Sequence, residues 1–255
     1  MFRTPLACVA ALALAAWLAL AATAKDAAHA AATPLDRAAF EIRVHDRAIG
    51  IETIEIENST DSLRVTSTSL QMLGTAGRDS MIKQTRLVAT LEDLDLHGYT
   101  SATRFQGQSL QRGVSCEDTL IHLSSFVNGR GETDFVARPP GRLFVIDAGS
   151  FVAFDLICRM LHGRAFVKRP VNMLILGPRD TVVTAAIEDG GTETLRWGTG
   201  PVTARRVTLT DRTSQYVFWM DSEGRMLRLE NAWSGVRIER KPPPARSGKP
   251  KPKAS

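Results

Sequence analysis

The chain has 255 residues, of which 44% are hydrophobic and 23% charged, with 32 lysines and arginines against 27 acids. This much apolar sequence can form a sizeable core, which excludes an intrinsically disordered protein. The net charge of +5 is not spread evenly, because residues 25–240 hold 26 bases and 27 acids and the surplus lies near the two termini. We therefore expect a nearly neutral folded body, and nucleic acid is not expected as a partner.

The first 24 residues are typical of a secretion signal. Arg3 precedes an almost unbroken apolar run at 6–20, and the small residues at 22 and 24 form the pattern that a signal peptidase recognises. The run is only marginally long enough to span a membrane. We therefore expect residues 1–24 to be a cleaved signal peptide, no transmembrane segment in the mature protein, and a periplasmic or secreted location.

The rest of the chain divides by composition into three segments. Residues 25–36 are rich in alanine and are expected to form a linker, followed by a single β-rich domain at 37–240. Residues 241–255 contain three consecutive prolines and then alternating lysine and proline, which excludes helix and sheet. We expect a disordered tail that either adheres weakly to an anionic surface of the cell envelope or simply keeps the protein soluble.

Alternation of apolar and polar residues predicts β-strands throughout the domain. The expected strands are 40–45, 53–57, 62–70, 85–92, 102–106, 114–123, 143–147, 171–176, 181–188, 192–197, 202–210, 214–221, 226–230 and 236–240. Turn signals separate them, with Gly190 and Gly191 forming one such turn. Because most connections are short and lack helices, the pattern predicts an antiparallel meander and excludes a doubly wound parallel sheet.

The pattern changes phase near Gly50. Ile49 and Ile51 fall out of step with Ile54 and Ile56. One residue too many in this strand predicts a β-bulge that bends the sheet.

One helix is expected at 150–162, capped by Ser150 and ended by Gly163. It is apolar on most sides, and Asp155 and Arg159 belong to the narrow polar stripe that is left for solvent. A helix this apolar has to be covered on most sides. We therefore expect a strongly curved sheet, or a bound ligand, to surround it.

The cysteines and histidines give no strong signal for chemistry. Cys116 and Cys158 either form a disulfide or are small buried hydrophobic residues. Cys116 and His122 are expected on one strand some 20 Å apart, too far for a nucleophile and its base. The histidines occur singly, so no metal site is expected, and no cofactor motif is present.

The segment with the most site-like composition is 147–150, at the entrance of the expected helix. There Asp147 and Ser150 stand beside helix N–H groups that can hold an anion or an oxyanion. A hydrolase or isomerase site is one interpretation. The other is that Ser150 only caps the helix and Gly149 fits the bend.

The order of these parts resembles a known group of bacterial proteins. A signal peptide is followed by strands of the form F-x-I-x-V…A-I-G, one apolar helix after the middle, and a closing V-F-W-M-D-S-E-G-R-M-L-R-L-E hairpin. This is similar to periplasmic proteins of unknown function whose fold is like that of the lipoprotein carriers LolA and LolB. The resemblance implies an antiparallel half-barrel over residues 40–240 with the helix in its concavity.

Our leading hypothesis is a non-catalytic periplasmic binding or accessory protein that holds a lipid or another apolar ligand between the curved sheet and the helix. The side chains expected to line that space are Phe151, Phe154, Ile157, Leu161, Trp197 and Trp219. The alternatives are a structural or interaction protein of the cell envelope with a closed core, and an enzyme with a site near Asp147 and Ser150.

Overall fold

The computed structural model describes residues 33–74 and 79–243. The predicted signal peptide, most of the predicted linker and most of the predicted tail lie outside these residues. The described residues from Pro34 onward belong to one compact unit. In the described residues, no helix combines the length and the hydrophobicity needed to cross a membrane.

The described chain forms fifteen strands and one helix, α2 (Val152–Leu161). The strands before the helix are β1 (Thr33–Val44), β2 (Arg47–Asn58), β3 (Ser62–Leu73), β4 (Asp79–Thr90), β5 (Leu96–Phe105), β6 (Gln108–Cys116), β7 (Leu120–Val127), β8 (Arg130–Ala137) and β9 (Leu143–Asp147). Those after it are β10 (Lys168–Leu176), β11 (Thr181–Trp197), β12 (Gly200–Thr210), β13 (Gln215–Met220), β14 (Met226–Asn231) and β15 (Val236–Arg240).

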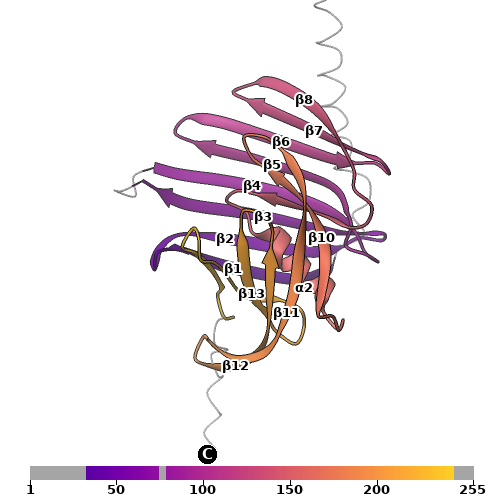
Figure 1. Ribbon diagram of the computed structural model, residues 1–255. Coiled ribbons are helices and arrows are strands. Elements are labelled where there is room, and N and C mark those ends of the chain that lie inside the picture. Colours follow the sequence, from indigo (N-terminus) through magenta and orange to yellow (C-terminus); the bar gives the residue numbers. More distant parts are fainter. Residues whose placement is uncertain (1–32, 75–78, 244–255) are drawn as a thin grey trace, which may run out of the picture. The chain divides into compact units, whose positions relative to one another are not determined.

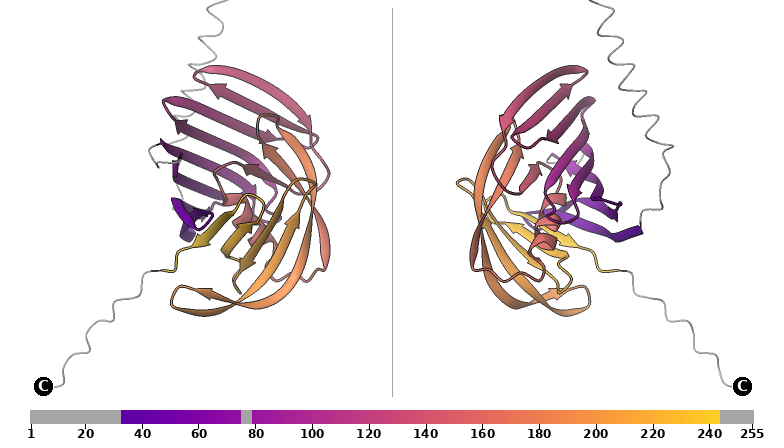
Figure 2. Two further views of the ribbon diagram at one scale, coloured as in Figure 1. Left: turned by 60° about the vertical axis from the view of Figure 1, so that its left-hand side comes forward. Right: turned by 90° about the vertical axis from the view of Figure 1, so that its right-hand side faces the viewer.

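All fifteen strands belong to one open, strongly curved sheet (Figures 1 and 2). The order is β8-β7-β6-β5-β4-β3-β2-β1-β15-β14-β13-β12-β11-β10-β9, so the first and last strands pair in the middle and the edges are β8 and β9. The antiparallel meander expected over the last strands is confirmed. The exception to antiparallel pairing is β9 with β10, a parallel pair joined through α2.

The helix lies on the concave side of the sheet, where the two halves face each other (Figure 2). Its apolar side chains join one core cluster with inward residues of both halves of the sheet. The Phe154 ring packs against Tyr216, with centroids 4.9 Å apart, and against Phe218 at 6.4 Å. The mainly β fold with a single covered helix therefore agrees with the sequence prediction.

Several strands begin earlier than predicted, among them β2, β4, β5 and β6, and the division of the chain into strands differs in three places. The segment 114–123 is not one strand, because a turn at 117–119 separates β6 from β7. The strands expected at 181–188 and 192–197 are one strand, β11, and the Gly190-Gly191 pair lies at a register shift between Asp189 and Thr192. Strand β8 was not expected, because it is an exposed edge strand with little apolar sequence.

The bulge expected near Gly50 is absent from the ladder between β2 and β3, where pairing runs without a shift from Gly50 to Asn58. The phase of the isoleucines has another cause. Glu52 takes the inward position in line with Ile54 and Ile56, and its side chain is fully buried. A buried carboxylate, not an extra residue, therefore produces the irregular pattern.

The helix also begins differently from the prediction. It starts at Val152, its N-cap is Phe151, and no side chain of the cap residue bonds to its first turn, so Ser150 is not the cap. Asp155, expected to face solvent, is only 1% exposed, and Arg159 is partly buried. At the other end of the domain, β1 begins at Thr33, inside the expected linker 25–36.

Candidate functional site

The loop that leads into α2 is fixed by a cluster of buried polar side chains on the concave face of β2–β5. Asp147, at the end of β9, accepts hydrogen bonds from Tyr99 Oη at 2.7 Å and Ser101 Oγ at 2.9 Å. Lys83 Nζ lies 2.5 Å from the other oxygen of Asp147 and donates to the Ala148 carbonyl at 2.6 Å. Strands β4 and β5 thus hold β9 across the interior of the molecule.

Glu52 organises the second half of this cluster. One of its carboxylate oxygens accepts from Ser67 Oγ at 2.8 Å and from Ser150 Oγ at 3.0 Å, and the other accepts from the Phe151 amide at 2.9 Å. Thr85 completes the chain through a 2.8 Å contact between its hydroxyl and that of Ser67. The helix N-terminus is therefore capped by a strand far away in the sequence.

Burial shifts the ionisation of this cluster. It raises the pKa of Glu52, although the donors around the carboxylate oppose the shift, and it lowers the pKa of Lys83 despite the neighbouring Asp147. Burial and the Asp147 charge together raise the pKa of Tyr99 well above its ordinary value. Each shift reflects the cost of placing a charge away from water.

This arrangement positions the helix and gives little access to a substrate. Asp147 and Ser150 are 6% and 7% exposed, and both use their side-chain oxygens in bonds to the sheet. The bonds of segment 147–150 are therefore structural, as in the second interpretation of its sequence. The residue that holds the helix start is Glu52, however, and not Ser150 acting as a cap.

The six side chains predicted to line an apolar ligand space fall into two separate clusters. Phe154, Ile157 and Leu161 are buried in the main core, and half-buried Phe151 packs against it. Trp219 belongs to a smaller cluster with Leu195, Ala204 and Leu227, against which Trp197 packs. Both indole N–H groups are bonded, Trp197 Nε1 to the Arg240 carbonyl at 2.6 Å and Trp219 Nε1 to Glu193 at 2.5 Å.

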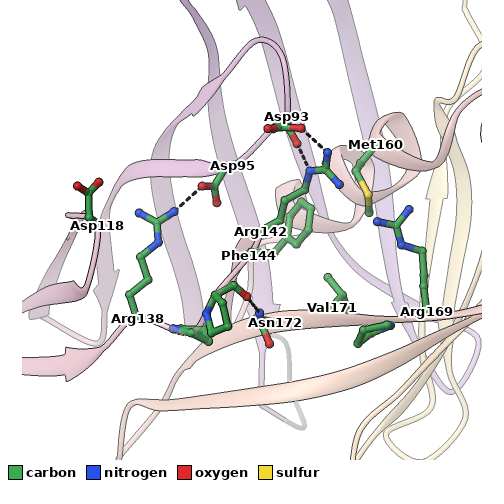
Figure 3. A pocket seen from close by; sticks show the side chains of 14 residues that line it. Asp93, Asp95, Asp118, Arg138, Arg142, Phe144, Met160, Arg169, Val171 and Asn172 are labelled. Carbon is green, nitrogen blue, oxygen red and sulfur yellow. Dashed lines mark hydrogen bonds and ion pairs between the residues drawn. The ribbon is translucent and has the colours of Figure 1, made fainter.

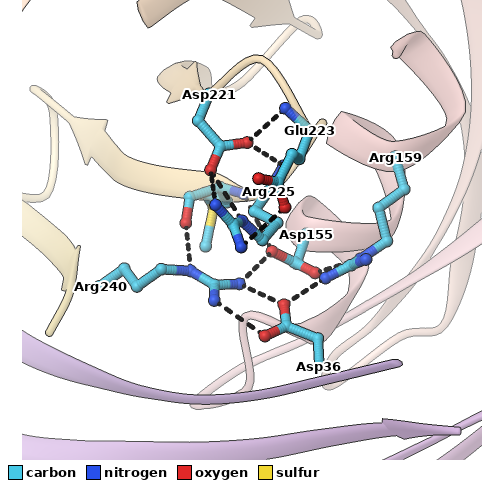
Figure 4. A network of polar contacts seen from close by, with 8 residues as sticks. Asp36, Asp155, Arg159, Asp221, Glu223, Arg225 and Arg240 are labelled. Carbon is cyan, nitrogen blue, oxygen red and sulfur yellow. Dashed lines mark hydrogen bonds and ion pairs between the residues drawn. The ribbon is translucent and has the colours of Figure 1, made fainter. Parts of the chain in front are cut away.

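A network of ions joins the helix to both ends of the described chain (Figure 4). Asp155 accepts from Arg159 at 2.7 Å, from Arg240 at 3.1 Å and from the Met226 amide at 3.0 Å. Asp36 near the start of β1 pairs with both arginines, and the bond to Arg240 is 2.9 Å long. These arginines keep the pKa of Asp36 below its ordinary value, against the effect of its burial.

A polar pocket of about 710 Å³ opens beside β9 and β10 (Figure 3). It lies at the end of the sheet where the loops β4–β5, β6–β7 and β8–β9 face the beginning of β10 and the end of α2. We call it the end pocket. It is lined by Asp93, Asp95, Asp118, Arg138, Pro139, Pro140, Gly141, Arg142, Phe144, Met160, Arg169, Pro170, Val171 and Asn172.

Two arginines of the end pocket are held by acids. Arg138 pairs with Asp95 at 2.5 Å, and Arg142 pairs with Asp93 and also donates to its carbonyl. These bonds tie the β8–β9 connection to the β4–β5 loop. They also neutralise four of the six charges around the pocket.

Arg169 differs from these two arginines. Among the described residues it has no acid partner, and its partly buried side chain lies near Arg142 and Arg164. Burial first, and then these two like charges, lower the pKa of Arg169. Asp118, on the β6–β7 loop, has no cationic partner among the described residues either.

Sequence reasoning missed most of these residues. Arg164 and Arg169 belong to a basic stretch, 164–169, which is the available signal for this part of the pocket. Glu52 and Lys83 occupy inward positions of alternating strands, and that phase was the available signal. The end pocket itself brings together three loops, the end of α2 and the beginning of β10, which no local pattern reveals.

Cys116 and Cys158 are free thiols in the structure, and burial raises the pKa of Cys116 to about 11. Because β6 and β7 form a hairpin, His122 pairs with Ser115 and Cys116 with Ile121. Cys116 and His122 are therefore on adjacent strands and not on one strand, but their side chains point to opposite faces of the sheet. The His122 imidazole lies 3.2 Å from Glu117. The described residues contain no group of three or more histidine, cysteine or acidic side chains suited to a metal ion.

Comparison with known proteins shows the fold of this chain. No family model matches the sequence, and no curated protein does. Among solved structures, the crystal structure of a β-barrel-like protein of the domain of unknown function DUF1849 from Brucella abortus is similar over 80% of this chain and 94% of that one. The TM-score is 0.50 and the sequence identity 11%. The chain therefore has a β-barrel-like fold, and its similarity to the lipoprotein carriers stays a prediction.

Proposed function

We propose that this chain is a non-catalytic binding protein of the bacterial cell envelope, and that its ligand is a small anion held by Arg169 in the end pocket. The charge balance of the pocket carries the proposal. Asp95 and Asp93 neutralise Arg138 and Arg142, whereas Arg169 has no acid partner among the described residues. A carboxylate or phosphate would supply the missing charge through a two-pronged hydrogen bond.

The surroundings of Arg169 favour binding over mere solvation. The Arg169 residue is partly buried, and the nearby Arg164, which has no acid partner among the described residues, adds positive potential. Phe144, Met160 and Val171 contribute buried apolar surface to the pocket. An anion between such walls loses part of its water and interacts more strongly than on an open surface.

Two observations support the other parts of the proposal. The cell-envelope location rests on the secretion signal predicted at 1–24. The non-catalytic character rests on the buried and fully bonded state of Asp147 and Ser150, which leaves the predicted enzyme site without an open approach.

Isothermal titration calorimetry with succinate and with inorganic phosphate at low ionic strength tests the proposal. We expect the wild-type chain to bind at least one of these anions and Arg169→Gln to bind it at least tenfold more weakly. Arg86→Gln, which removes an exposed arginine from the outer face of β4, is the matched control and retains wild-type affinity. Equal affinities of the wild type and Arg169→Gln, or no binding of either anion, would contradict the proposal.

A structural or interaction protein with a closed core is the second candidate. It is favoured by the packing of Phe154 on Tyr216 and Phe218, which occupies the space proposed for an apolar ligand. Trp197 and Trp219 lie in a separate cluster, and their indole N–H groups are already bonded. Delipidation followed by native mass spectrometry distinguishes these possibilities. Rebinding of a lipid would restore the apolar-ligand hypothesis, whereas a constant mass supports the closed core.

A further inference from the structure

The end pocket contains two charges of opposite sign that have no charged partner among the described residues. Arg169 comes from the beginning of β10 and Asp118 from the loop between β6 and β7. Figure 3 shows them at opposite ends of the pocket, with the paired residues between them. The pocket therefore has a positive end and a negative end.

The groups between these ends are already engaged with one another. The pairs Arg138–Asp95 and Arg142–Asp93 are neutral, and the Asn172 side-chain amide donates to the Pro140 carbonyl at 2.9 Å. Prolines contribute to the lining as well, and a proline has no backbone N–H to offer a ligand. Recognition by charge is thus concentrated at the two ends.

We propose that the ligand of the end pocket is a short peptide bound in an extended form, with its carboxylate on Arg169 and its ammonium group facing Asp118. This inference rests on the proposed function, because it uses the same anion-binding arginine, and it adds the chemical class of the ligand. A ligand with both charges complements the two ends of the pocket together. A simple anion complements Arg169 alone.

The size of the pocket suits such a ligand. A volume of about 710 Å³ lies within the usual range for small-molecule sites. An extended peptide of two to five residues spans about 7 to 17 Å at ~3.3 Å per residue. If the two ends act together, one length in this series places both termini on their partners, and binding peaks at that length.

Calorimetry with alanine peptides of two to five residues tests the inference. At the best length, we expect amidation of the peptide carboxylate to weaken wild-type binding about tenfold and to have no further effect in Arg169→Gln. Acetylation of the amino terminus is expected to weaken wild-type binding similarly and to have no further effect in Asp118→Asn. Asp61→Asn, which removes an exposed acid from the turn between β2 and β3, is the matched control and behaves as the wild type.

Succinate separates the failure of this inference from the failure of the proposed function. Asp118→Asn is expected to bind succinate as the wild type does, because succinate has no ammonium group. Unchanged binding of the capped peptides, or no dependence on peptide length, would overturn the inference while succinate binding still supports the anion site. If succinate and phosphate also fail to bind, the proposed function fails, and the peptide inference fails with it.

Discussion

The Glu52 carboxylate on β2 accepts a hydrogen bond from the Phe151 amide at the entrance of α2, although the two residues are 99 positions apart. The same side chain holds Ser150 through its other oxygen. The helix thus receives its N-terminal cap from the sheet and not from its own sequence. Formation of the helix start is therefore coupled to the correct placement of β2.

Replacing Glu52 with alanine should destabilise the protein strongly. The substitution leaves the Phe151 amide and the hydroxyls of Ser67 and Ser150 without their buried acceptor. We expect a loss of about 3 kcal/mol in the free energy of unfolding, measured by urea denaturation. Glu55→Gln, on the same strand but paired with the exposed Arg37, should cost no more than about 0.5 kcal/mol. A loss that small for Glu52→Ala would mean that the cap is not structural.

The raised pKa of Glu52 predicts a particular dependence of stability on pH. Because the folded state holds this proton more tightly than the unfolded chain, the contribution of Glu52 is fully present below the ordinary value of 4.5. It is lost as the pH rises through the raised pKa. Asp36, whose pKa is lowered, acts in the opposite sense below pH 3.8 and so lies outside this window.

The comparison of the wild type with Glu52→Gln isolates this effect, since the variant lacks the titrating group. We expect the free energy of unfolding of the wild type to decline relative to that of the variant as the pH rises above 4.5. Denaturation curves between pH 4 and 8 provide the measurement. A constant difference between the two proteins over this range would show that Glu52 does not change ionisation there.

Lys83 and Asp147 should behave as a coupled pair. Removing only the cation, with Lys83→Met, leaves a buried carboxylate and is expected to cost about 3 to 5 kcal/mol. Asp147→Asn in the same chain removes that charge but keeps an acceptor for Tyr99 and Ser101, so the double variant should be more stable than the sum of the single losses predicts. Additive losses would argue against direct coupling.

Arg240 should stabilise the contact between the helix and the chain ends. It binds both Asp36 and Asp155, which lie on β1 and α2. We expect Arg240→Met to cost about 3 kcal/mol and to increase hydrogen exchange at the Met226 amide, whose acceptor is Asp155. Arg237→Met, a half-exposed neighbour on β15 that pairs with Glu230, is the control and should change neither quantity appreciably. Unchanged exchange at Met226 in Arg240→Met would contradict this role.

The two cysteines should be unreactive in the folded protein. Cys158 is fully buried, and the pKa of about 11 for Cys116 lowers its thiolate fraction at pH 8 about 100-fold relative to a thiol of pKa 9. The third cysteine of the chain, Cys8, lies in the predicted signal peptide and is replaced by serine for this test. In that Cys8→Ser background we expect negligible labelling by iodoacetamide before unfolding and two labelled sites after unfolding without reductant. No labelling after unfolding would show that the two cysteines are bridged.

The course of the sheet could be predicted from the sequence because apolar alternation and turn residues mark most strands. The prediction failed where the residues of a turn are atypical, or where residues typical of a turn lie inside a strand. Glu117, Asp118 and Thr119 form a turn without glycine or proline, so β6 and β7 were joined. Gly190 and Gly191 resemble a turn but allow a register shift inside one long strand.

The interior polar residues could not be predicted for a different reason. A charged residue at an inward position can be buried only if its partners come from distant strands, and a single sequence does not show those partners. Glu52 was therefore interpreted as part of a bulged strand, and Asp155 as a surface ion paired with Arg159. Their partners become visible only when β2, β14 and α2 are brought together.

The pairing of β1 with β15 affects how the chain can fold. Phe40 lies opposite Arg240, so the central seam of the sheet forms only when the last strand is available, whereas both edges come from the middle of the chain. Pairing of strands so distant in the sequence is slow, because bringing them together closes a loop that contains most of the chain and costs conformational entropy. A circular permutant with its new ends in the β8–β9 connection would read the strands in their spatial order, from β9 through β15 and β1 to β8. In that permutant β1 would follow β15 directly across the seam. Every pair of neighbouring strands, except β9 and β10 around α2, would then be a local hairpin.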